Sequence, residues 1–191
     1  MLSRFTKVLS LAGILLAGAL DGAGMALAVE VGEKAPDFTL PSTTGKDISL
    51  SEFLGKKYVL IEFYGGDFDP VCAKNLSARK ADYSKFQQLD IQILGISGNA
   101  PFSQKTFADS LQLPYPLLSD MEQNATTKAY GVVSGNKWRR SFFLIDKQGI
   151  IRGQWRGEDE GVFSNEPLLK AAQEIAGQPA EGVGEKKASG M

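Results

Sequence analysis

The segment YVLIEFYGGDFDPVC, residues 58–72, predicts a buried strand, a loop and the start of a helix, in that order. Its first part, Tyr58 to Tyr64, is a nearly continuous apolar, β-branched and aromatic run, which is typical of a strand buried on both faces. Residues 65–71 combine glycines, aspartates and a proline, and this composition predicts a loop. The only cysteine of the chain, Cys72, therefore lies where a strand ends, a loop turns and a helix begins.

Apolar periodicity on both sides of this segment predicts alternating strands and helices. Large apolar residues recur at helical spacing from Cys72 to Leu89, which predicts one long helix, and Ile91 to Ile96 predicts a second buried strand. The sequence further predicts a hairpin over residues 38–50, one helical turn at 51–55, helices at 102–111 and 123–130, a strand–turn–strand unit at 141–155, and a last helix capped by Ser164 that ends near Ala176. This order indicates an α/β protein of thioredoxin-like fold, with a central mixed sheet, helices on both faces and an N-terminal β-hairpin.

The first 28 residues have the composition of a secretory signal peptide. Arg4 and Lys7 supply a positive region, an apolar run follows at residues 8–20, and Ala26 and Ala28 supply the small residues of a cleavage site. We therefore predict export, with a periplasmic destination, and cleavage after Ala28.

An uncleaved membrane anchor is the competing interpretation of this segment. Asp21 ends the apolar run well short of the ~20 residues that a spanning helix needs, which favours cleavage. Residues 29–177 are then one domain, and residues 178–191, which have no apolar periodicity, are predicted to form a disordered tail.

Composition excludes several classes of chemistry. The chain has no histidine, so Ser-His-Asp and Cys-His catalysis, HExxH zinc sites and histidine-ligated copper or haem are ruled out. A single cysteine excludes an intramolecular disulfide, a CxxC redox pair and a cysteine-cluster metal site. A formal charge of −1 offers no basic surface for nucleic acid. We expect no cofactor, no metal and no nucleic-acid partner.

The position of Cys72 by itself leaves two interpretations open. The N–H groups and dipole of a helix that starts there favour the thiolate, which is the nucleophilic form of the side chain. Alternatively, Cys72 is a small apolar residue on a helix face, as most free cysteines are.

Several segments resemble peroxiredoxins of the alkyl hydroperoxide reductase/thiol-specific antioxidant family. They are GEKAPDFTLP at 32–41, TGK at 44–46, SLSEFLGK at 49–56, LGIS at 94–97, LPYPLLSD at 113–120, AYGV at 129–132 and RSFFLIDK at 140–147. The resemblance covers residues 31–176 and is greatest to the bacterioferritin-comigratory, or Q-type, subgroup.

The resemblance implies roles for individual residues. Cys72 falls on the peroxidatic cysteine, whose thiolate attacks a peroxide oxygen and becomes a sulfenic acid. Arg140 falls on the arginine that faces this thiolate from a distant strand, where its charge lowers the cysteine pKa and binds the leaving oxygen. A solvated cation beside Arg139 is the alternative for Arg140 on the residues alone.

The sequence departs from the family pattern Pro-x-x-x-Thr-x-x-Cys at two positions. Gly65 replaces the proline and loosens the turn, and Asp69 replaces a threonine that donates a hydrogen bond to the sulfur or the peroxide. An ionised aspartate cannot donate and raises the pKa of a neighbouring thiol. Asp69 is therefore protonated and acts as a donor, pairs with Arg140, weakens the activity, or simply caps the helix ahead of Pro70.

The resemblance implies a thiol-dependent peroxidase of the one-cysteine type. Ser77 stands where many Q-type members have a resolving cysteine, so an external thiol or a thioredoxin-like reductant must reduce the sulfenic acid. The implied substrates are hydrogen peroxide or organic hydroperoxides, and a homodimer is a candidate assembly.

Two other functions remain as alternatives. One is a catalytically weak redox-sensing or binding protein that forms mixed disulfides through Cys72. The other is a thiol–disulfide oxidoreductase, which is disfavoured because Asn75 stands where a CxxC motif has its second cysteine.

Overall fold

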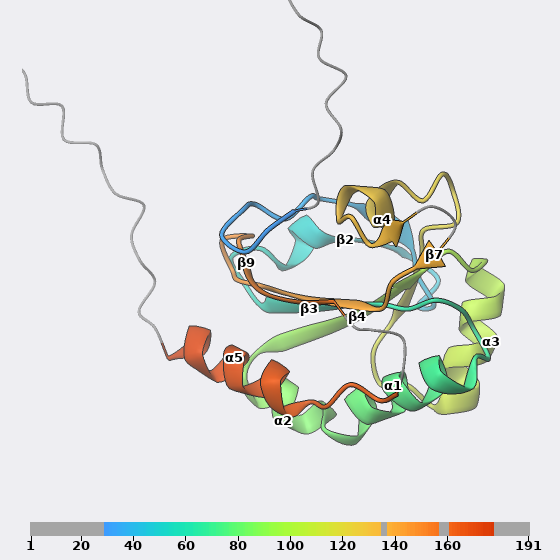
Figure 1. The fold of residues 1–191 in the computed structure, drawn as a ribbon. Helices are drawn as coiled ribbons and strands as arrows, with labels where there is room; N and C mark the ends of the chain where they lie inside the picture. The colour runs from blue at the N-terminus through green and yellow to red at the C-terminus, as the bar shows by residue number, and fades with distance from the viewer. Residues whose placement is uncertain (1–28, 135–136, 157–160, 178–191) are drawn as a thin grey trace, which may run out of the picture.

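The structure, a computed structural model, describes residues 29–134, 137–156 and 161–177 (Figure 1). The predicted signal peptide and the predicted tail lie outside the described residues. The central feature is a five-stranded sheet with the strand order β5-β4-β3-β8-β9. Its strands are β3 (Tyr58–Phe63), β4 (Ile91–Ser97), β5 (Leu117–Ser119), β8 (Ser141–Ile145) and β9 (Ile151–Arg156). The predicted mixed sheet is confirmed, because β3 pairs with β4 in parallel and with β8 in antiparallel orientation.

Strand β3 is buried on both faces, as its apolar sequence predicts, because it lies in the middle of the sheet. Alternate side chains of a strand point to opposite faces. Val59, Ile61 and Phe63 belong to one apolar cluster, whereas Leu60 and Tyr64 belong to a second cluster on the other side. The sheet therefore separates two cores, each closed by a different set of elements.

Helices α1 (Pro70–Ala81), α2 (Tyr83–Gln88) and α5 (Glu166–Ala176) lie on one side of the sheet (Figure 1). The opposite side carries the hairpin of β1 (Thr39–Pro41) and β2 (Asp47–Ser49), the 3-10 turn Leu50–Phe53 and helix α4 (Ala125–Ala129). Helix α3 (Pro101–Leu111) follows β4 and packs against β5. The predicted hairpin and helices on both faces are thus confirmed. Among the helices of the described ranges, none is both long and apolar enough to cross a membrane.

The prediction of one helix from Cys72 to Leu89 is wrong, because Asp82 interrupts it. Asp82 adopts φ −105° and ψ 16°, outside the helical range, and separates α1 from α2. Its carboxylate accepts a hydrogen bond from Asn165 at 2.7 Å and pairs with Lys85 at 2.8 Å. A long-range contact to the start of α5 therefore accompanies a break that apolar spacing could not reveal.

Other boundaries also differ from the prediction. Helix α1 begins at Pro70, inside the segment predicted as a loop. Helix α4 is shorter than predicted, since Gln123 and Asn124 have positive φ angles of 62° and 51°. Helix α5 begins at Glu166, although Ser164 Oγ does accept a hydrogen bond from the Glu166 N–H at 3.2 Å. The pair β6 (Val133–Ser134) and β7 (Lys137–Trp138) was not predicted, because each strand has only two residues.

Candidate active site

Cys72 is the third residue of α1 and lines a small pocket at the N-terminal end of that helix. Only 4% of the residue is exposed. The pocket has a volume of about 350 Å³, and the other residues that line it are Gly65, Gly66, Asp69, Val71, Trp138 and Arg140. The structure thus brings together all three residues that the sequence singled out, from the loop after β3, from α1 and from the segment before β8.

Asp69 caps helix α1. Its Oδ1 accepts hydrogen bonds from the backbone N–H groups of Val71 at 2.9 Å and Cys72 at 2.8 Å, and Pro70 occupies the first helical turn. These bonds satisfy N–H groups that a helix start otherwise leaves without partners.

The cap also fixes the charge of Asp69. The Cys72 N–H, and more weakly the Val71 N–H and the charge of Arg140, hold the pKa of Asp69 below its usual value. The carboxylate is therefore ionised at neutral pH and accepts hydrogen bonds. The geometry favours the capping interpretation over a protonated donor, and Asp69 makes no ion pair with Arg140 within the part of the chain that the structure describes.

Burial raises the pKa of the Cys72 thiol above its ordinary value. The backbone N–H groups of Gly66 and Gly65 act in the opposite direction, because they stabilise the thiolate, while Asp69 adds to the increase. The start of a helix was expected to favour the thiolate, but desolvation outweighs the donors in this arrangement. A thiolate at Cys72 therefore needs more stabilisation than these two N–H groups supply.

Arg140 is the source of positive charge in the pocket. The antiparallel register pairs Phe63 with Ser141, so Arg140 lies beside the end of β3, where the loop to Cys72 begins. The residue is 8% exposed, and its NH1 group donates a hydrogen bond to the Gly161 carbonyl at 3.1 Å. Its Nε has no partner among the described residues. Arg140 is thus a buried cation and not the solvated one that its neighbour Arg139 suggested.

Asn75 holds the segment around Gly161 against α1, a role that the sequence did not reveal. Its Nδ2 donates to the carbonyls of Val71 at 2.8 Å and Gly161 at 3.1 Å, and its Oδ1 accepts from the Phe163 N–H at 2.8 Å. Because Asn75 and Arg140 donate to the same Gly161 carbonyl, they fix that segment and the arginine together. Only the position of Asn75, one helical turn after Cys72, could have suggested this contact.

The loop between β3 and α1 is anchored by Asp67. Its carboxylate accepts hydrogen bonds from the Tyr64 hydroxyl at 2.9 Å and the Ser103 hydroxyl at 2.6 Å, and its N–H donates to Asn99 Oδ1 at 3.2 Å. Gly65 was expected to loosen this loop in place of a proline. The Asp67 contacts tie the same loop to the junction of β4 and α3, which limits its freedom.

Trp138, on β7, forms one wall of the pocket. A Cβ atom on Gly98 would lie 2.8 Å from the Trp138 ring, closer than van der Waals contact permits. The lack of a side chain at Gly98 therefore makes room for the indole.

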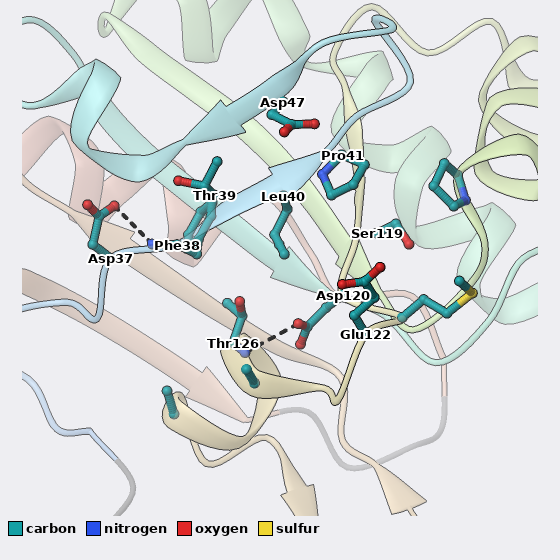
Figure 2. Close-up of a pocket in the computed structure, with 14 residues that line it drawn as sticks. Asp37, Phe38, Thr39, Leu40, Pro41, Asp47, Ser119, Asp120, Glu122 and Thr126 are labelled. Carbon is teal, nitrogen blue, oxygen red and sulfur yellow. Dashed lines mark hydrogen bonds between the residues drawn. The ribbon is translucent and has the colours of Figure 1, made fainter.

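A larger pocket of about 720 Å³ lies between the hairpin β1–β2 and α4 and contains neither Cys72 nor Arg140 (Figure 2). Its most buried acid, Asp120, accepts hydrogen bonds from the N–H groups of Thr126 at 3.3 Å and Thr127 at 2.7 Å. Asp120 thus stabilises the start of α4. No group of three or more potential metal ligands occurs within the described residues.

Comparisons with known proteins agree with this geometry. The family model described as "AhpC/TSA family" matches residues 31–154. "Peroxiredoxin Q, chloroplastic" from Populus jackii is 39% identical over 150 residues, which cover 77% of this chain and 70% of that protein. The protein of the same name from Sedum lineare is also 39% identical over 150 residues, which cover 77% and 80% of the two chains.

Solved structures give the same result. The crystal structure of "Peroxidoxin BcpB" from Mycobacterium tuberculosis superposes with a TM-score of 0.68 at 27% identity and covers 76% of this chain and 97% of that chain. A structure of "Peroxiredoxin Q" from Xanthomonas campestris gives a TM-score of 0.65 at 25% identity, with 73% and 91% coverage. This chain therefore belongs to the AhpC/TSA family of peroxiredoxins, resembles the peroxiredoxin Q and bacterioferritin-comigratory members of that family, and is a thiol-dependent peroxidase with a thioredoxin-like fold.

Proposed function

We propose that this peroxiredoxin is an exported enzyme of the one-cysteine type, with Cys72 as its nucleophile and Arg140 as the cation that stabilises reacting charge. The observation that carries the proposal is that Cys72 and Arg140 line one small pocket at the start of α1. The size of that pocket, about 350 Å³, favours hydrogen peroxide and small organic hydroperoxides as substrates.

The first step of the proposed reaction forms an S–O bond and breaks the O–O bond of the peroxide. The Cys72 thiolate attacks the terminal oxygen of ROOH, the sulfur loses two electrons, and the leaving RO⁻ takes a proton from solvent to give ROH or water. Negative charge moves from sulfur to the leaving oxygen during this step. Arg140 stabilises the negative charge both on the sulfur and on the leaving oxygen. The Gly65 and Gly66 N–H groups stabilise it on the sulfur.

An external thiol completes the proposed cycle, because Cys72 is the only cysteine of the chain. One thiol attacks the sulfenic acid, releases water and forms a mixed disulfide. A second thiol breaks that disulfide and returns Cys72 to its reduced form. Ser77, which stands where many Q-type relatives have a resolving cysteine, lies on α1 and carries no redox function.

Export to the periplasm is part of the proposal and rests on the composition of residues 1–28. Expression in a bacterial host should yield a periplasmic protein whose N-terminal residue is Val29. An N-terminus at Met1 in the membrane fraction would instead identify an uncleaved anchor.

Stopped-flow mixing of the reduced protein with hydrogen peroxide tests the chemistry. Cys72→Ser is expected to abolish peroxide consumption, and Arg140→Gln to slow Cys72 oxidation by about 100-fold, the usual effect of removing one group that stabilises developing charge. Full peroxidase activity in Cys72→Ser would overturn the assignment. Glu174→Gln, an exposed change on α5, is the control variant and should react like the wild type.

A redox-sensing or binding protein is the second candidate function. Burial and the charge of Asp69 both raise the pKa of Cys72, and a low thiolate fraction slows attack on peroxide. If oxidation of Cys72 by hydrogen peroxide is no faster than that of free cysteine, this candidate is favoured. Capture of a specific partner as a mixed disulfide through Cys72 would then identify its function.

A further inference from the structure

Glu62 is a carboxylic acid in the middle of the central strand. It is fully buried, and neither carboxylate oxygen has a hydrogen-bond partner among the described residues. Its neighbours Leu60 and Tyr64 both point into the core that contains Cys72. Since Glu62 lies between them on β3, it extends toward the same side of the sheet. A buried acid without partners is costly, so its position needs a physical reason.

Two buried arginines provide the charges that face Glu62. Arg79, on α1, is fully buried, donates to the Phe163 carbonyl, and lies 5.1 Å from the centre of the Phe142 ring. Phe142 is the residue that pairs with Glu62 in the β3–β8 register. Arg79 Nε and NH1 and Arg140 Nε have no partners within the described part of the chain. The charges of Arg79 and Arg140 both act on Glu62.

Arg140 connects this buried acid to the reactive cysteine. Its charge acts on Glu62 in the core, while its side chain also lines the pocket of Cys72. A Glu62 carboxylate and a Cys72 thiolate are thus two anions on either side of the same cation, which lines the pocket of one and acts on the other. Each makes the other less favourable, because the interaction between two titrating groups is reciprocal.

We propose that Glu62 is a positioning residue of the peroxidase site, whose protonation state sets how much of the positive charge of Arg140 is available to Cys72. With Glu62 protonated, the full charge of Arg140 stabilises the thiolate. With Glu62 ionised, its carboxylate neutralises part of the charge of Arg140, and Cys72 loses its proton less readily. The inference rests on the proposed role of Cys72 as the nucleophile.

The surroundings of Glu62 place this change near neutral pH. Burial raises the pKa of Glu62 from 4.5 to about 7, although Arg79 and Arg140 oppose the increase. Tyr115 also faces the group, and burial keeps the pKa of its hydroxyl well above the ordinary value, so it stays neutral. Tyr64, on β3 itself, likewise stays neutral because burial raises its pKa.

The other charged groups near this cluster act on the two arginines. Asp69 and Cys72 lie on the pocket side of Arg140, and Asp82 acts on Arg79 at the far end of α1. The chain contains no histidine, the only side chain that ordinarily titrates near pH 7. A titration step near neutrality in the chemistry of Cys72 therefore points to Glu62.

Alkylation of Cys72 in the full chain by iodoacetamide, followed across pH, tests the proposal. Only the thiolate reacts, and Cys72 is the only cysteine. In the wild type, the logarithm of the rate constant should rise with pH, flatten around pH 7 as Glu62 ionises, and rise again. Glu62→Gln, which resembles the protonated acid, should give a straight line. The variant should match the wild type near pH 5.5 and react about tenfold faster near pH 8.5, as two charges sharing one buried cation imply.

A purely structural role for Glu62 predicts a ratio between variant and wild type that does not change with pH. Such a constant ratio, or a straight line for the wild type, would overturn the proposal. Because the wild-type profile is informative by itself, the test does not depend on folding of the variant. Glu174→Gln, which changes an exposed carboxylate, is the matched control and should keep the flattened profile.

A parallel series with hydrogen peroxide separates this proposal from the proposed function. Slow oxidation of Cys72 by peroxide, combined with a flattened alkylation profile, would contradict the peroxidase assignment and leave the coupling of Glu62 to Cys72 intact. Rapid oxidation with a straight alkylation profile would contradict the role of Glu62 alone.

Discussion

The two faces of strand β3 are built in different ways. Val59, Ile61 and Phe63 point into an apolar core, where the Phe63 ring packs against Tyr130 at 5.3 Å and Phe143 at 5.7 Å between ring centres. The opposite face carries Glu62 between two apolar residues, with two buried arginines nearby. The first face is built for stability. The second accepts the cost of buried charge and is the face that holds Cys72.

The largest expected effect is on the apolar face. Phe63→Ala removes a fully buried ring and leaves a cavity, which should lower the free energy of unfolding by about 3–5 kcal/mol. Urea unfolding monitored by circular dichroism measures this loss. The loss should be the same at every pH, since no titratable group lies in the apolar cluster except Tyr130, whose pKa burial keeps far above neutrality. A pH-dependent loss would show that the two faces are not independent.

The charged face should instead make stability depend on pH. Because burial raises the pKa of Glu62 from 4.5 to about 7, the folded protein holds this proton more tightly than the unfolded chain. The stability that comes from the protonated acid is complete at a pH below 4.5, the pKa of Glu62 in the unfolded chain. It is lost as the pH rises through the pKa in the folded protein, about 7.

The difference between these two pKa values corresponds to a change of about 3 kcal/mol in the free energy of unfolding between low and high pH. Glu62→Gln should remove this pH dependence. Unfolding free energies of both proteins, measured from about pH 4.5 to pH 8, should therefore diverge above pH 5, with the variant the more stable. Parallel curves over this range would contradict the expectation.

A smaller effect is expected at the helix cap, where the roles of charge and hydrogen bonding can be separated. Asp69→Ala removes the acceptor of the Val71 and Cys72 N–H groups and should cost about 1 kcal/mol of stability. Asp69→Asn keeps an acceptor but removes the charge, so stability should be retained while the pKa of Cys72 falls. Thermal unfolding and thiolate absorbance at alkaline pH measure the two effects. A lower pKa in the alanine variant only would argue against the role of charge.

The smallest effect is expected for an exposed ion pair, which sets the scale for the buried charges around Glu62. Lys105 and Asp109 on α3 are more than half exposed and one helical turn apart. Lys105→Ala should change the free energy of unfolding by about 0.5 kcal/mol or less, because solvent screens both charges. A change as large as the one expected for Glu62→Gln would mean that exposure does not explain the contrast.

Much of the fold could be predicted from local sequence, because apolar periodicity reports burial directly. The buried runs at 58–64 and 91–96 became β3 and β4, and the hairpin at 38–50 formed as β1 and β2. The break at Asp82 could not be predicted, since its partner Asn165 lies 83 residues away in the chain. Local patterns carry no information about such contacts.

The candidate site was found in the sequence through residue types and family resemblance, whereas its electrostatics were not. Residue types and the resemblance predict Cys72, Asp69 and Arg140 as site residues, and these three line one pocket. Two other features of the site depend on packing between distant elements. They are the pocket wall formed by Trp138 and the contact by which Asn75 anchors the Gly161 segment. In the sequence, only closeness along the chain pointed to these residues, since Trp138 lies near Arg140 and Asn75 lies near Cys72.

The sequence by itself determined the strand, the loop, the single cysteine and the absence of histidine, because these follow from local composition. Only the tertiary structure decided that Asp69 is an ionised helix cap, that desolvation dominates the pKa of Cys72, and that Glu62 and Arg79 lie buried behind Arg140. The physical reason is that a pKa depends on every charge and donor within several ångströms of a buried group. These neighbours come from β3, α1 and the segment before β8, which are far apart in the chain and meet only when the sheet has formed.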